Sequence, residues 1–224
     1  MVSNTSYGHL KMQKGYDFSM SETSFLKVVQ TCISNLTETF LLTPYLFYTE
    51  SDLHCYFYKL LSRQLEDSGF RFCQTQDNKL SSLLHKEYPT KKRYRQKLED
   101  PTGRRGHFDI CIWNPDKVSE RVFRNKSSED IDKTQQTYFA FEFLLPEGTE
   151  KSNLKHALTH TKWDMLKLSE NEVKYGYILV FARDWNFREE FLRAVKEMNM
   201  PSNIALIFVE NSDGEKFIER LGRK

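Results

Sequence analysis

Hydrophobic positions recur with two different periods along the chain, and the change of period separates predicted helices from predicted strands. Between residues 21 and 42 the apolar positions are spaced by three and four, as on one face of an amphipathic helix. A second helix is predicted after Thr49, because Thr49 and Asp52 have the spacing of a capping box and apolar residues follow at helical intervals. Two helices are therefore expected before the first strand.

From about residue 70 to residue 113 the period approaches two, which is typical of strands. The polar stretch 114–136 is expected to be a surface loop or excursion. The later elements are predicted as strand YFAFEFLL, a helix, strand YGYILVFA, helix REEFLRAVKEM and strand NIALIFVE. Consecutive strands favour an antiparallel meander and strand–helix–strand passages favour crossovers. We therefore expect an α/β (mixed α+β) fold, with a mixed sheet of about five strands flanked by helices and an extra N-terminal helix.

Composition narrows the classes of protein and leaves the choice between them to local features. The 224 residues suit one domain over 21–224 after a polar, flexible tail at 1–20. No apolar run reaches the roughly 18 residues of a membrane span, so no membrane partner is expected. The four cysteines are widely spaced, which favours reduced thiols and a cytoplasmic location. A net charge of +2 is too small to indicate a polyanion-binding protein by itself.

Two acids, Asp109 and Glu142, interrupt predicted strands that are otherwise apolar. Side chains alternate across a strand, so each acid faces away from the more apolar side of its strand. If the strands are neighbours over one core, both carboxylates lie on the same side of the sheet, where they repel unless a proton or cation lies between them. Mg²⁺, or Mn²⁺ in its place, is a hard cation that binds carboxylate oxygens and can activate water.

This arrangement resembles the PD-(D/E)XK nuclease superfamily. The resemblance covers about 50–210 and rests on the segments ESDLHCYFYKLL, LLHKEYP, RRGHFDICIW and YFAFEFLL, followed by a helix and a strand. It implies a restriction-endonuclease-like core and a metal-dependent nuclease that hydrolyses DNA phosphodiester bonds, with Asp109 and Glu142 as catalytic metal ligands. DNA is favoured over RNA as the partner, and a homodimer stays open because many members of the superfamily act as dimers.

The sequence departs from the pattern of this superfamily at one position. Leu144 stands two residues after Glu142, where the family has a lysine that steadies the attacking water or the phosphate charge. Some members supply this lysine from the following helix, which makes Lys155 the first candidate and Lys162 the second. The alternatives are a weak enzyme and a catalytically inactive nuclease-fold module that binds nucleic acid or is structural. A third is an unrelated interaction protein in which Glu142 is salt-bridged to a Lys or Arg.

Further acids could complete the metal site. Asp52, with Glu50 beside it, could add a carboxylate from the start of the second helix, or it could interact with the dipole of that helix instead. Glu87 could line the same cleft, or it could be an exposed strand residue. His156 and His160 are four residues apart, a spacing that can hold zinc, yet the sequence offers no obvious third ligand.

A basic cluster precedes the predicted strand of Asp109. It consists of Lys91, Lys92, Arg93, Arg95, Lys97, Arg104 and Arg105. Phosphate backbones attract such clusters, so the cluster is interpreted as a nucleic-acid-binding loop beside the metal site. The alternative is a solvated hairpin tip.

Overall fold

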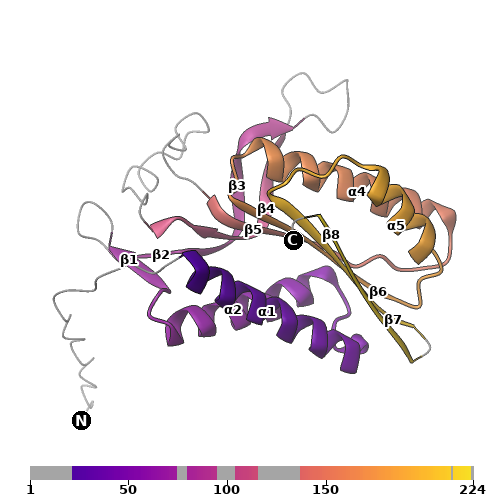
Figure 1. Cartoon of the computed structure of the whole chain (residues 1–224), viewed down its shortest axis with the longest axis horizontal. Coiled ribbons are helices and arrows are strands. Elements are labelled where there is room, and N and C mark those ends of the chain that lie inside the picture. Colours follow the sequence, from indigo (N-terminus) through magenta and orange to yellow (C-terminus); the bar gives the residue numbers. More distant parts are fainter. Residues whose placement is uncertain (1–21, 75–79, 95–103, 116–136, 213, 223–224) are drawn as a thin grey trace, which may run out of the picture.

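The protein has a mixed α+β fold, seen in a computed structural model that describes residues 22–74, 80–94, 104–115, 137–212 and 214–222. A twisted six-stranded sheet forms the middle layer (Figure 1). Two helices from the N-terminal part of the chain cover one face, and two later helices cover the other (Figure 1). The predicted tail 1–20 and most of the predicted loop 114–136 lie outside the described residues.

The central sheet is mixed, as predicted. Its strands are β3 (Leu84–Tyr94), β4 (Arg104–Trp113), β5 (Thr137–Leu144), β6 (Tyr175–Arg183), β7 (Ile204–Ser212) and β8 (Glu215–Gly222). They lie in chain order, with β3, β4 and β5 antiparallel, β5, β6 and β7 parallel, and β8 antiparallel to β7. The meander and the crossovers expected from the order of elements are both present.

Two features of the strands differ from the prediction. The segment FRFCQ supplies β1 (Phe72–Gln74), which pairs with β2 (Leu80–Ser82) in a separate two-stranded ribbon outside the central sheet. The edge strand β8 was not predicted from the sequence. It covers little of the core, and all of its side chains are exposed or half-buried, so its hydrophobic pattern is weak.

The first helix, α1 (Glu22–Leu42), forms where its apolar spacing predicts. After the short 3₁₀ turn η1 (Pro44–Leu46), α2 (Glu50–Asp67) begins at the predicted capping box. The Asp52 amide donates to Thr49 Oγ1 at 3.3 Å, and the Thr49 amide donates to Asp52 Oδ2 at 2.8 Å. These two bonds satisfy amides that the first turn of a helix leaves without a partner.

The strand β5 is buried on both of its faces, as expected for a central strand with helices above and below. On the α1–α2 side the Phe141 ring meets the Phe57 ring of α2, with centroids 5.0 Å apart. The opposite face is covered by α4 (Lys151–Glu170) and, further along the sheet, by α5 (Arg188–Glu197) (Figure 1). Among the described residues, no helix combines the length and apolar character needed to cross a membrane.

Candidate active site

Asp109 lies where the pairing of β4 with β5 ends. The last paired residues at that end are Ile110 and Phe141, so the next position along the ladder would bring Asp109 opposite Glu142. The Phe143 amide donates instead to Asp109 Oδ2 at 2.8 Å. A side-chain carboxylate therefore accepts a main-chain hydrogen bond just beyond the last backbone pair, and this bond holds Asp109 at the end of the ladder.

Glu142 is buried, with a relative exposure of 1%, and it has a cationic partner. Lys167 of α4 donates to Glu142 Oε2 at 2.5 Å, to the His107 carbonyl at 3.0 Å, and lies 3.1 Å from Asp164 Oδ1. The cation that compensates the Glu142 carboxylate thus comes from α4, the helix that follows its own strand.

The charges around Lys167 shift one another strongly. Burial raises the pKa of Glu142 well above its usual value, and Lys167 opposes that rise. Burial likewise raises the pKa of Asp164, to about 6, again against the effect of Lys167. Burial alone would lower the pKa of Lys167, but Glu142 and Asp164 outweigh it and raise the pKa, so the ammonium stays protonated. One cation faces several carboxylates, so the cluster holds more acids than bases and favours either a bound proton or a further cation.

A second group of ligand atoms adjoins this cluster from the α2 side. Glu50 and His54 are four residues apart on α2 and so share one face of the helix. Together with Asp109 they offer ligand atoms that all lie within 4.8 Å of one another. His54 Nε2 is 3.4 Å from Asp109 Oδ2 and 3.9 Å from Glu50 Oε1. The His54 ring is held in place by the Phe143 ring, whose centroid is 4.9 Å away.

The two groups are electrostatically connected through Asp109. Burial raises the pKa of Glu50, and Asp109 and Asp164 raise it further, while His54 lowers it. Within the described parts of the chain, His54 Nε2 and Glu142 Oε1 are buried without a hydrogen-bond partner, although His54 Nε2 lies 3.4 Å from Asp109 Oδ2. Buried polar atoms normally have partners, so this site has spare ligand capacity.

These observations fit a divalent cation. Two carboxylates and one imidazole are within reach of a common centre, and carboxylate oxygen and imidazole nitrogen are ordinary ligands of divalent ions. Such an ion would also stabilise the ionised forms of these closely spaced carboxylates. The donor set therefore suits a metal, and the residues that would hold it are Glu50, His54 and Asp109.

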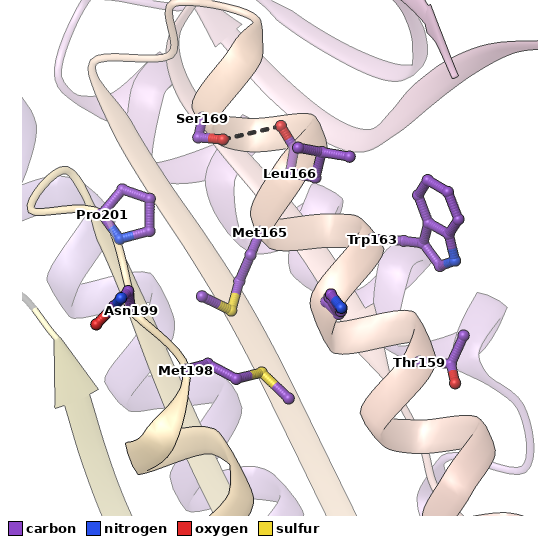
Figure 2. Close-up of a pocket in the computed structure, with 9 residues that line it drawn as sticks. Thr159, Trp163, Met165, Leu166, Ser169, Met198, Asn199 and Pro201 are labelled. Carbon is purple, nitrogen blue, oxygen red and sulfur yellow. Dashed lines mark hydrogen bonds between the residues drawn. The ribbon is translucent and has the colours of Figure 1, made fainter. Parts of the chain in front are cut away.

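The two lysines proposed from the sequence lie elsewhere on α4. Lys155 and Lys162 are exposed, and helical geometry puts them about 120° and about 140° around the axis from Lys167. Lys162 lines an apolar hollow between α4 and the segment after α5, to which Met165, Met198 and other side chains contribute (Figure 2).

Sequence reasoning missed Lys167, whose partner is Glu142. A signal was available, because Lys167 sits between the buried positions Met165 and Leu168 on the inward-facing side of the predicted helix. A lysine at such a position needs an acidic partner, and Glu142 was the acid that needed a base.

Asp52, Glu87 and Glu142, which were predicted as metal ligands, do not join the group of possible metal ligands that the structure brings together. Asp52 Oδ2 accepts from the amides of Tyr48 and Thr49, at 3.0 and 2.8 Å, and these hydrogen bonds lower its pKa. The carboxylate that the start of α2 contributes to this group is therefore Glu50. Glu87 is exposed on β3, where its backbone has a φ of 52°, in the left-handed region.

The predicted basic cluster is only partly placed. Arg95 and Lys97 lie outside the described residues. The backbone of the others is at one end of the β3–β4 hairpin, where Arg93 pairs with Arg105 and Tyr94 with Arg104; Lys91 and Lys92 precede them on β3. Their role as a nucleic-acid-binding loop stays a prediction.

Comparison of the chain with protein-family models, with curated proteins and with solved structures found no match. The restriction-endonuclease-like core and the nuclease activity therefore stay predictions from the sequence.

Proposed function

We propose that the protein is a divalent-metal-dependent nuclease, which hydrolyses phosphodiester bonds of nucleic acid. The observation that carries the proposal is the position of Lys167, whose ammonium lies at Glu142 beside the Glu50, His54 and Asp109 group. In the superfamily pattern, the residue two positions after Glu142 is a lysine, which supplies an amine beside two acids at the end of a strand pair. In this sequence that residue is Leu144. Lys167 restores the amine from the next helix.

The metal ligands in this proposal are Glu50, His54 and Asp109. When bound, a Mg²⁺ or Mn²⁺ ion would lower the pKa of a water molecule and offset charge on the phosphate. The protein positions these ligands by two separate means. The main-chain amide of Phe143 holds Asp109, and the helical spacing of Glu50 and His54 presents both side chains to it.

Glu142 and Lys167 act on protons and charge. Glu142 Oε1 has no hydrogen-bond partner in the described structure, and burial raises the pKa of this carboxyl, which makes its ionised form a stronger base toward water. Lys167 orients this carboxylate and places a positive charge where negative charge develops on the phosphate. In the reaction one water oxygen bonds to phosphorus, the bridging P–O bond breaks, and a proton ends on the leaving oxygen.

A cleavage assay tests this function directly. Plasmid DNA, single-stranded DNA and RNA are incubated with the protein and Mn²⁺ or Mg²⁺, beside Asp109→Asn and Lys167→Ala variants. Cleavage by the unaltered protein should fall by about 10²-fold or more in both variants. Lys162→Ala is the matched control on the same helix and should cleave normally. Activity that persists in both site variants would come from a contaminant and contradict the proposal.

The second candidate is a nuclease-fold module that binds nucleic acid without turnover. Leu144 favours it, and so does the complete burial of Glu142 against Lys167, which leaves one carboxylate oxygen already occupied. Binding that weakens with salt, without cleavage in any metal, would select this candidate.

The ion pair of Glu142 and Lys167 would also be expected in an unrelated interaction protein. That alternative is favoured if thermal stability does not respond to divalent ions. DNA rather than RNA, and a homodimer, stay expectations.

A further inference from the structure

A cluster of exposed apolar side chains lies at the end of α1 and in the short connection from α1 to α2. Leu42, Tyr45, Leu46 and Tyr48 are 64%, 61%, 54% and 74% exposed, and they are four of the seven large hydrophobic side chains exposed among the described residues. Single exposed hydrophobic residues are normal, but a contiguous group marks a surface that binds something. We call residues 42–48 the aromatic segment.

The aromatic segment is held firmly despite its exposure. Arg183 Nη1 donates to the Phe47 carbonyl at 2.6 Å, and Nη2 donates to the Tyr48 carbonyl at 3.3 Å. The same guanidinium lies 5.5 Å from the centre of the Tyr45 ring, whose hydroxyl donates to Asp184 Oδ2 at 2.6 Å. Phe47 points inward and is buried. A surface that is already ordered loses little conformational entropy when it binds a ligand.

The aromatic segment adjoins the candidate active site. Tyr48 precedes Glu50 by two residues, so their Cα atoms are within about 7 Å. The segment also approaches the link between β5 and α4, because Arg183 bridges the Tyr48 carbonyl and the Glu147 carboxylate. A ligand that reaches from the site to the aromatic segment would need to span only a short distance.

Charge near the aromatic segment is compatible with a polyanion that carries flat rings. Lys151 and Lys155 are exposed in the first turns of α4, just after the link that Arg183 contacts, and lysines there attract phosphates. Two nearby acids already have partners, since Asp184 accepts from Tyr45 and Asp52 accepts from the main chain at the start of α2. The segment therefore offers tyrosine rings, and the link that it approaches leads to the exposed lysines at the start of α4, beside the exposed acid Glu150.

We propose that the aromatic segment stacks on unpaired bases of a single-stranded nucleic acid whose reacting phosphate lies at the candidate active site. This inference rests on the proposed function and adds the substrate class to it. Base stacking on aromatic side chains tolerates any sequence because every base has a flat face. A duplex keeps these faces inside its own stack, so the segment would distinguish single strands from duplexes. Tyr48 is the residue with the most exposed ring.

Binding is measured by fluorescence anisotropy with the full chain, in EDTA and in Ca²⁺, so that the result does not depend on cleavage. The probes are a labelled single strand of DNA or RNA, the same strand in a duplex, and an abasic strand with the same number of phosphates. We expect the single strand to bind more tightly than either alternative. Tyr48→Ala should weaken single-strand binding by roughly fivefold to 150-fold, and Tyr48→Phe should keep it.

Ile218→Ala is the matched control, because Ile218 is an exposed apolar residue on β8 and should not affect binding. The proposal is overturned if Tyr48→Ala binds the single strand normally, if it weakens binding to the duplex equally, or if no strand binds in either buffer. It is also overturned if Tyr48→Ala changes the oligomeric state in light scattering instead, because the segment would then join two copies of the chain. Normal single-strand binding without any cleavage would support the stacking of bases on the aromatic segment and contradict the nuclease proposal alone.

Discussion

The compensation of buried negative charge in this protein depends on one side chain, that of Lys167. Its side chain is 15% exposed and lies between the side chains of Glu142 and Asp164, which are 2% and 13% exposed. Buried charges are stable only when they have partners, because each one loses its interactions with water. Removing the one ammonium from this group would leave two buried acids without compensation.

Replacement of Lys167 by methionine should therefore destabilise the fold. The expected loss is about 3–5 kcal/mol in the free energy of unfolding, which is typical when one partner of a buried ion pair is removed. Urea denaturation of the variant measures this loss. The double variant Lys167→Met/Glu142→Gln should recover part of it, because Glu142 is then neutral. A single variant as stable as the parent would mean that water reaches these acids and that the ion pair contributes little.

The raised pKa of Asp164 predicts how the free energy of unfolding depends on pH. Its pKa is raised by burial to about 6 from 3.8, so between these values the folded protein binds more protons than the unfolded chain. The stability contributed by this group is therefore present below about pH 4 and is lost as the pH rises through 6. The stability of the parent relative to Asp164→Asn should fall by roughly 2 kcal/mol between pH 4 and pH 7. A pH-independent difference in denaturation midpoints would contradict the raised pKa.

At the scale of elements, α2 carries two acids with separate tasks in its first turn. Asp52 closes the capping box, while Glu50 contributes to the group that could hold a metal ion. The sequence predicted the cap from the spacing of Thr49 and Asp52. It could not decide which acid faces Asp109, because that depends on how the helix is rotated against the sheet.

The two tasks can be separated by mutation. Asp52→Ala should lower the free energy of unfolding by about 1 kcal/mol and leave Mn²⁺ binding unchanged. Glu50→Gln should weaken Mn²⁺ binding and leave stability almost unchanged, because this side chain is partly exposed. Calorimetric titration with Mn²⁺ and thermal unfolding measure both properties on each variant. If Asp52→Ala also loses the ion, Asp52 would belong among the ligands after all.

The hydrophobic pattern of the sequence predicts some elements of this fold and not others. The helices α1 and α2 were predicted because one face of each is buried and the other is solvated. The edge strand β8 was missed because none of its side chains is fully buried and because its sequence, EKFIERLG, does not alternate apolar with polar residues. Lys167 was missed because a lysine on a helix is usually exposed, and only packing against the sheet shows that this one faces inward.

At the scale of the whole molecule, the candidate site is assembled from both faces of the sheet. Glu50 and His54 come from the helical layer on one side, and Lys167 comes from the layer on the other (Figure 1). The sequence predicted the pair Asp109 and Glu142 because both interrupt apolar strands. The remaining members are far apart in the chain, and their meeting follows from the order of strands and the packing of two layers, which local periodicity does not contain.

The hydrogen bond from the Phe143 amide to Asp109 has a mechanical consequence. A carboxylate that is bonded only to other side chains can rotate to follow whatever it binds, but Asp109 is anchored to the backbone of the neighbouring strand. Rotation of this carboxylate would break that anchor. Any cation that Asp109 holds would therefore be positioned by the relative placement of β4 and β5, and a shear between those two strands would move the cation with it.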